Sequence, residues 1–301
     1  MKNSTVSALA WGGVLLAGAL WGGGALVAQF VMVHGMSPQS LALARFACGL
    51  PLLWWWHLRQ PAPSARAGRW GGLSWRERAM VAGTGVAMAL NVSCWFAGIA
   101  ALGAALPTVI SVCCAPVIVS VVSMLRGYER PTGRLLAALL LASAGVALMV
   151  FPANGWVWPQ HYLAGLAWSF ASAGLHALVV LGNARMPSRV TAVTASAWGM
   201  TAAAGCMALL VLGQGLPTWP HGGPAWLGVA YTGVVTTSVA YLLFAWGARR
   251  LGPTAAGICT LTEPLVATLL AAGLLSEPLA PRQWLGAAGL GLAMLLLMRR
   301  A

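Results

Sequence analysis

The chain contains 301 residues, of which 59% are hydrophobic and 7% are charged, and it carries a formal net charge of +13. Because a soluble domain carries about 25% charged residues, this composition excludes a water-facing globular enzyme as well as a disordered chain. The basic excess is typical of membrane proteins, whose cytoplasmic loops collect arginine and lysine. We therefore expect a lipid bilayer, and no nucleic acid, as a partner.

Ten apolar runs follow one another along the chain, separated by clusters of glycine, proline or arginine. Since about 20 apolar residues span a bilayer, each run predicts a transmembrane helix. The sequence therefore predicts an all-α membrane protein with ten transmembrane helices. The predicted helices cover residues 8–33, 39–58, 79–100, 105–125, 134–151, 162–183, 190–212, 225–248, 254–275 and 281–298.

Positive charge alternates between the two sets of loops that this arrangement creates. Fifteen of the 17 lysine and arginine residues lie at the termini or in the loops after the second, fourth, sixth and eighth predicted helices. The opposite loops contain only Arg282, and Arg45 falls inside a predicted helix. Because arginine and lysine accumulate in cytoplasmic loops, this bias predicts that both termini are cytoplasmic.

The chain also contains an internal repeat. Pro116 and Glu129 are 13 residues apart, and Pro264 and Glu277 repeat this spacing 148 residues later. Each proline falls in the fourth predicted helix of its half, so Pro116 and Pro264 are expected to be paired hinges or, alternatively, static kinks. Five helices is an odd number, so the second half enters the membrane in the opposite direction, as in many secondary transporters. The two expected inverted repeats cover residues 1–153 and 154–301.

Short motifs around these positions are typical of one family. They are Gly35-Met36-Ser37-Pro38 leading to Arg45-Phe46, Ala115-Pro116 followed by Tyr128-Glu129-Arg130, Thr262-Glu263-Pro264-Leu265-Val266-Ala267, and Ser276-Glu277-Pro278. With them the chain resembles the EamA-type permeases of the drug/metabolite transporter superfamily over nearly its whole length. The resemblance implies a secondary transporter of the bacterial inner membrane that exports amino acids, aromatic ones included, with broad specificity.

Two charged residues remain inside predicted helices. Arg45 falls in the second helix, and Glu263 falls near the middle of the ninth, about 8 Å deeper from the outer surface at 1.5 Å per residue. A charge inside the bilayer is costly, so it marks a functional site by default. An amino acid needs a cation for its carboxylate and an anion for its ammonium group. Arg45 and Glu263 supply one of each, although they can also bind only each other.

Polar and aromatic residues at similar depth complete the predicted substrate site. A histidine side chain ordinarily titrates near neutral pH, so His176 is a candidate proton relay, and protons are a candidate coupling ion. Asn91 and Trp95 share one face of a helix at i, i+4 spacing, as do Thr237 and Tyr241. The alternative for each aromatic residue is a place in the packed core or against lipid. The candidate substrate-binding residues are Glu263, Arg45, His176, Trp21, Asn91, Trp95, Trp168 and Tyr241.

Several kinds of chemistry have no motif in this sequence. It contains no GxxxxGKS/T phosphate-binding loop and no HExxH pair. It contains no aspartate, and its six cysteines fall within apolar runs, as small packing residues do. We therefore expect neither an enzyme nor a metal or cofactor site. Two alternatives to amino acid export stay open: a carrier of drugs or other metabolites with the same fold, and a membrane scaffold without transport.

Overall fold

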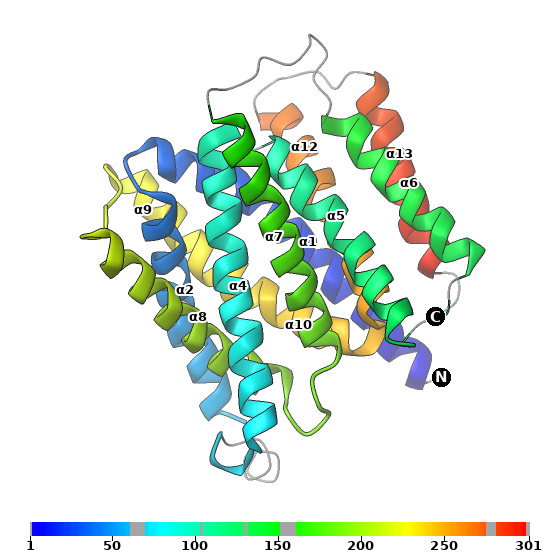
Figure 1. The fold of residues 1–301 in the computed structure, drawn as a ribbon, viewed down its shortest axis with the longest axis horizontal. Coiled ribbons are helices and arrows are strands. Elements are labelled where there is room, and N and C mark those ends of the chain that lie inside the picture. The colour runs from blue at the N-terminus through cyan, green and yellow to red at the C-terminus, as the bar shows by residue number, and fades with distance from the viewer. Residues whose placement is uncertain are drawn as a thin grey trace.

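The computed structural model describes residues 2–60, 70–102, 105–128, 130, 132–150, 161–274 and 281–298. Within these ranges the chain consists of helices and short connections, without a strand, as the sequence predicts (Figure 1). Glu129 and Glu277, the two glutamates of the sequence repeat, lie outside the described residues.

The first half contains five long helices and one short 3-10 turn. Helix α2 starts after Ser37, whose side-chain oxygen accepts a hydrogen bond from the Ser40 backbone N–H at 3.2 Å, and Pro38 takes the first helical position, where its missing N–H has no cost. The elements are α1 (Lys2–Val33), α2 (Pro38–Leu58), η1 (Trp70–Gly72), α4 (Trp75–Leu102), α5 (Ala105–Leu125) and α6 (Gly133–Val150).

The second half differs from the prediction in two places. The predicted helix over 225–248 is present as one uninterrupted helical segment, but its middle nine residues are π-helix with α-helix on either side. The prediction of a continuous helix over 254–275 was wrong, because the helix is broken at Thr260–Leu261. The elements are α7 (Tyr162–Ala184), α8 (Ala192–Gln214), α9 (Gly223–Ala230), η2 (the π-helix Tyr231–Val239), α10 (Ala240–Leu251), α11 (Pro253–Cys259), α12 (Thr262–Leu274) and α13 (Pro281–Met298).

The break between α11 and α12 has a local cause. Pro264 has no backbone N–H, and in a continuous helix its ring clashes with the carbonyl four residues earlier, that of Thr260. The Thr260 hydroxyl also donates to the Gly257 carbonyl at 2.7 Å, and such local bonds compete with helical ones. Pro264 therefore lies in the first turn of α12, where proline is tolerated, and not in the middle of a helix as expected.

The chain is a multi-pass membrane protein by the length and composition of its helices. Five described segments are long and apolar enough to cross a bilayer, and three shorter apolar helices accompany them. The predicted number of ten spans stays a prediction. The five long segments are Ala8–Val33, Trp75–Leu102, Tyr162–Ala184, Ala192–Gln214 and Gly223–Leu251.

Corresponding elements of the two halves begin at a constant distance in sequence. Helices α4, α5 and α6 begin at residues 75, 105 and 133, whereas α9, α11 and α13 begin at 223, 253 and 281, which is 148 residues later each time. The halves also exchange packing partners. Helix α1 packs against η2 and α10, α7 packs against α4, α2 packs against α8, and α6 packs against α13.

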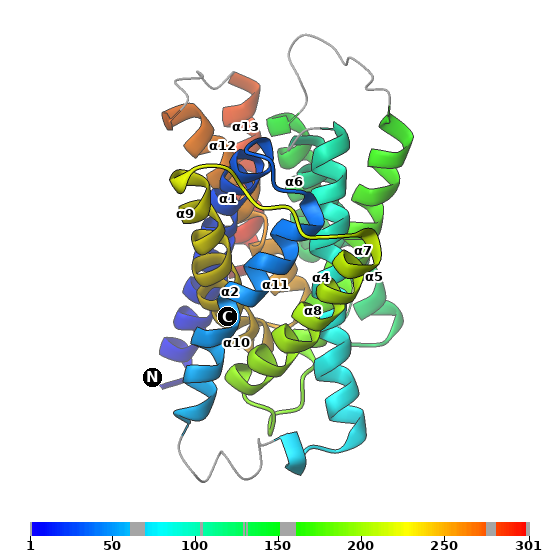
Figure 2. The ribbon, with the colours of Figure 1, turned by 90° about the vertical axis from the view of Figure 1, so that its left-hand side faces the viewer.

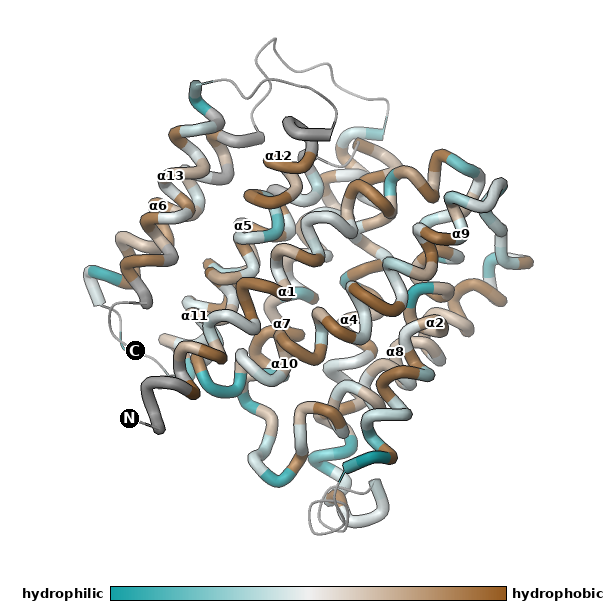
Figure 3. Tube along the Cα trace, turned by 180° about the vertical axis from the view of Figure 1, so that it is seen from behind, coloured by the Kyte–Doolittle hydropathy of each residue, from teal (hydrophilic) through white to brown (hydrophobic). Residues whose placement is uncertain are grey.

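Figures 1 and 2 show the course of the chain through this bundle. Helix α1 begins at the lower end and α7 begins at the upper end, so the first helices of the two halves run in opposite directions. Hydrophobic residues recur along the helices of the bundle, as Figure 3 shows by colour. Leucines that are more than half exposed lie on several outer faces, among them Leu140, Leu163 and Leu227. This is the surface that a bilayer covers.

Glycines allow close approach where the site is built. A Cβ on Gly22 of α1 would lie 2.5 Å from the carbonyl oxygen of Glu263, so α1 reaches the start of α12 only because this side chain is absent. A Cβ on Gly49 of α2 would lie 2.8 Å from the Gly233 carbonyl oxygen in η2. These two contacts fix α1 against α12 and α2 against the π-helix.

Candidate functional site

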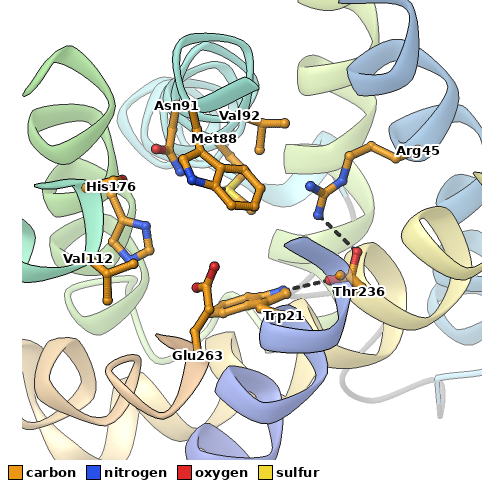
Figure 4. A pocket seen from close by; sticks show the side chains of 12 residues that line it. Trp21, Arg45, Met88, Asn91, Val92, Val112, His176, Thr236 and Glu263 are labelled. Carbon is orange, nitrogen blue, oxygen red and sulfur yellow. Dashed lines mark hydrogen bonds between the residues drawn. The ribbon is translucent and has the colours of Figure 1, made fainter. Parts of the chain in front are cut away.

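A small buried cavity of about 50 Å³ lies between the two halves, where α1, α2, α4, α5, α7, η2 and α12 meet. Six of the eight predicted site residues line it, and Figure 4 shows the arrangement. These six are Trp21, Arg45, Asn91, Trp95, His176 and Glu263. The sequence prediction missed the other lining residues, which are Gly24, Met88, Val92, Ser111, Val112 and Thr236.

Arg45 reaches the cavity from α2 and is only 5% exposed. Its Nε donates to the Thr237 hydroxyl at 3.0 Å and its Nη2 donates to the Thr236 hydroxyl at 3.1 Å. The guanidinium carbon lies 5.8 Å from the ring centre of Phe46 and 5.9 Å from that of Phe96. None of these partners is charged, so the positive charge of Arg45 is positioned but not neutralised.

The π-helix η2 supplies both hydroxyl partners of Arg45. The hydroxyls of Thr236 and Thr237 both donate to the Thr232 carbonyl, at 2.5 and 2.9 Å, which leaves their oxygen lone pairs to accept from Arg45. The Ser238 hydroxyl also donates across to the Gly49 carbonyl of α2 at 2.7 Å. Short π-helical segments are rare and often mark functional sites. Here the π-helix lets two consecutive threonines bind one side chain.

Glu263 lies in the first turn of α12, directly after the break, and is 7% exposed. Its carboxylate points into the cavity, between His176 on one side and Arg45 on the other (Figure 4). Among the described residues, the ion pair that forms is Arg189 with Glu77, so Arg45 and Glu263 do not bind each other directly. They are still close enough to interact electrostatically. The cavity thus contains one cation and one anion that are held apart.

His176 enters from α7, on the other side of the cavity from Arg45 in Figure 4. Its Nε2 is buried and has no hydrogen-bond partner in the described part of the chain. Unpartnered buried nitrogens are uncommon and call for a specific explanation. Beside it, the Ser172 hydroxyl donates to Asn91 at 2.7 Å and lies 2.8 Å from the Ser111 hydroxyl. The cavity therefore offers polar groups beyond the two charges.

Two tryptophans form aromatic walls, and each has its ring nitrogen fixed by a hydrogen bond. Trp21 donates to the Thr236 carbonyl at 2.8 Å and Trp95 donates to the Thr108 hydroxyl at 3.1 Å. Because their N–H groups are satisfied, these rings present mainly their apolar surfaces to the cavity.

The other predicted site residues lie elsewhere. Trp168 is 48% exposed on the outside of α7, and Tyr241 is buried but accepts a hydrogen bond from Asn183 at 2.9 Å, outside the cavity lining. Pro116 lies inside the continuous helix α5, whereas Pro264 follows the helix break. Within the described residues, no group of three or more His, Cys, Asp or Glu side chains can hold a metal ion.

Hydrogen bonds join the two halves at both ends of the molecule. Where α1 finishes, the His221 N–H donates to the His34 carbonyl at 2.8 Å and the Ser37 N–H donates to the Thr218 hydroxyl at 2.6 Å. Where α2 finishes, Arg189 donates to Glu77, with its Nη2 2.5 Å from Oε2. This hydrogen bond and the negative charge raise the pKa of Arg189 above its ordinary value. The pair is therefore charged at every physiological pH.

Comparison with known proteins identifies the family. The model of the EamA-like transporter family matches residues 8–151 and again 163–299. The chain belongs to the EamA-like transporter family. The resemblance that the sequence motifs predict is thereby confirmed, and the two matched segments correspond to the two halves of the internal repeat.

Relatives of this EamA-like protein include two bacterial proteins. One is the uncharacterized transporter YwfM of Bacillus subtilis (strain 168), 29% identical over 217 residues that cover 70% of each chain. Another is the uncharacterized transporter sll0355 of Synechocystis, 28% identical over 287 residues, or 89% of this chain and 83% of the relative. A solved crystal structure of a protein shares the fold with a TM-score of 0.77 at 19% identity, covering 99% of this chain and 98% of the other. This EamA-like protein is therefore a membrane transporter of the drug/metabolite type.

Proposed function

We propose that this transporter exports amino acids across the bacterial inner membrane, with broad specificity that includes aromatic ones. One observation carries the proposal: Arg45 and Glu263, from different halves, face the same buried cavity without forming an ion pair. An amino acid has one charge for each of them. Its carboxylate binds Arg45 and its ammonium group binds Glu263, through charge-assisted hydrogen bonds, which are the strong ones.

The aromatic walls account for broad specificity. Trp21 and Trp95 border the cavity together with Met88 and Val92, and these side chains offer apolar surface without a charged group. Such surface binds aliphatic and aromatic side chains through burial, which discriminates weakly between similar sizes. Asn91 and the unpartnered nitrogen of His176 remain for polar side chains or for a proton.

The cavity is too small for an amino acid in this conformation. A volume of about 50 Å³ accommodates one or two water molecules, whereas ligand pockets measure about 300–1,000 Å³. Binding therefore requires the helices around it to separate. The contacts at the two ends, Ser37–Thr218 and Glu77–Arg189, are the ones that open alternately in this proposal. The hinges in this proposal are the break at Thr260–Leu261 and the part of α5 around Pro116.

The proposed topology has ten spans in two inverted repeats, 1–153 and 154–301, with both termini in the cytoplasm. The constant shift of 148 residues and the exchange of packing partners support the repeat. The arginine bias supports the orientation. Cysteines at Gly71 and Gly213, where a side chain meets nothing within 4 Å, test it in a variant without native cysteines. A membrane-impermeant reagent should label them from opposite sides, and labelling from one side contradicts the topology.

We propose protons as the coupling ion, because His176 and Glu263 are the titratable groups that face the cavity. The decisive experiment is flux in liposomes that contain only this protein. We expect counterflow of radiolabelled amino acids that responds to an imposed pH gradient. Absence of flux for every amino acid, with flux of a drug-like aromatic amine, favours the other carrier function. Absence of all flux favours a scaffold.

A further inference from the structure

A second and larger hollow lies at the end of the molecule where α10 finishes. This groove measures about 1,060 Å³ and runs between α1, the start of α8 and the last turns of α10. Figure 3 shows α1 and α10 side by side on this face. The groove shares no residue with the central cavity and has no part in the transport proposal.

Two arginines at the end of α10 line the groove. Arg249 donates to the backbone carbonyls of Val190 and Thr191, and Arg250 donates to the Trp246 carbonyl at 2.7 Å while stacking over its ring at 4.1 Å. All these partners are neutral, and Nε of Arg249 has no partner within the described residues. The arginines therefore carry two uncompensated positive charges into the groove.

The start of α8 adds to this positive potential. Thr191, the N-cap residue of α8, lines the groove together with Ala192 and Val193, whose N–H groups have no partner inside a helix. A helix N-terminus carries about half a positive charge, and the C-terminus of α10 carries about half a negative one. These two partial charges offset each other, so the two arginines make the electrostatic potential of the groove positive.

The rest of the groove is largely apolar. Leu9 and Leu16 of α1 are 61% and 50% exposed and form one wall, with Leu243 of α10 opposite. Gly12 lies between the two α1 leucines, and a Cβ there would meet nothing within 4 Å. Between residues 8 and 16, α1 advances about 12 Å. This leaves a channel along the helix for part of an acyl chain.

We propose that this groove binds an anionic phospholipid. Its phosphate lies against Arg249 and Arg250 at the α8 N-terminus, and an acyl chain follows α1 past Gly12. A soluble anion uses only the charged end, whereas a lipid uses the charged end and the apolar wall together, which is the combination that the groove provides. The site does not depend on which solute the transporter carries.

The test is native mass spectrometry of the detergent-purified protein titrated with phosphatidylglycerol or phosphatidylcholine. We expect the phosphatidylglycerol adduct to dominate, and Arg249→Gln with Arg250→Gln to weaken it by about fivefold for each arginine. Arg59→Gln is the matched control, because Arg59 also stacks on a tryptophan, Trp55, but does not line the groove. An equal loss in the control assigns the binding to general surface charge and overturns the proposal.

A second pair of variants tests the acyl channel without changing charge. Gly12→Leu should displace the lipid, whereas Gly83→Leu should not, because a Cβ at either position meets nothing within 4 Å but only Gly12 lines the groove. Glycerol phosphate, which lacks acyl chains, should not compete. If it competes as well as the lipid, or if Gly12→Leu leaves the adduct unchanged, the groove is not a lipid site.

Discussion

Helix α5 of the first half and the pair α11–α12 of the second occupy corresponding positions in the sequence, but only α5 is continuous. Residue Pro116 of α5 corresponds to Pro264 at the shift of 148 residues. Four residues before Pro116 stands Val112, which has no side-chain hydrogen-bonding group, whereas four residues before Pro264 stands Thr260, whose hydroxyl bonds back to Gly257. The two corresponding prolines therefore differ in their surroundings: Pro116 lies within a continuous helix, whereas Pro264 follows a helix break.

The break changes what the two halves contribute to the cavity. Glu263 follows it and turns its carboxylate inward, while the corresponding residue in α5 is Ala115. The same contrast separates α4, a regular α-helix, from its counterpart, which contains the π-helix η2. Repetition therefore supplies the scaffold, and departures from it in the second half supply Glu263 and the threonines that position Arg45.

The largest effect is expected from Glu263→Gln. Losing one charge-assisted hydrogen bond weakens substrate binding about ten- to hundredfold. Folding should be retained or improved, because Glu263 is a buried charge without a bound cation and its removal relieves a cost. Counterflow in liposomes measures the effect on transport, and a thermal unfolding curve measures the effect on folding. Normal transport in this variant contradicts a role for Glu263 in substrate binding.

Repair of the break is expected to have the next largest effect. The double variant Thr260→Val, Pro264→Ala favours one continuous helix like α5 and should move the Glu263 carboxylate out of position. We expect transport to fall about tenfold, which corresponds to the loss of one weak charge-assisted hydrogen bond. Pro116→Ala is the matched comparison, and it should lower transport less, because α5 is already a continuous helix. Equal losses in the two variants indicate that the break has no special role.

The helix positions could be predicted from the sequence, because apolar runs of about 20 residues are a strong signal. The pairing of Arg45 and Glu263 in one cavity was also accessible, since charges inside a membrane seldom face lipid. Thr236 was missed because the α-helical period places only one of two consecutive residues toward a partner, and nothing in the spacing reveals a π-helix. Trp168 was included because an entirely apolar helix does not show which face is buried.

A smaller effect is expected from the π-helix. Thr237→Val removes one of the two hydroxyls that position Arg45 while conserving the shape of the side chain. We expect KM to rise about tenfold with little change in the maximal rate, as for loss of a hydrogen bond to a charged group. Thr201→Val, which removes a hydroxyl bound to Trp54 far from the cavity, is the control. An unchanged KM means that Thr237 does not position Arg45 for binding.

The smallest effect is expected at the Glu77–Arg189 contact. The Arg189 side chain is 55% exposed, and exposed ion pairs contribute little to stability. The raised pKa of Arg189 adds stability that is lost only as the pH rises through that pKa, far above the physiological range, so salt and not pH should modulate the contact. Glu77→Gln should make the cavity more accessible to a labelling reagent from the end of the molecule where α2 finishes. We expect the rate of labelling to increase less than fivefold. A larger change at high salt than at low salt contradicts this electrostatic account.

The central claim is that Arg45 and Glu263 bind opposite ends of one zwitterion. Competition for counterflow by a free amino acid, its methyl ester and its N-acetyl form tests it most directly. The account predicts that only the free form competes well, that Arg45→Gln removes the preference over the methyl ester, and that Glu263→Gln removes the preference over the N-acetyl form. Equal competition by all three forms in the unmodified protein would contradict it.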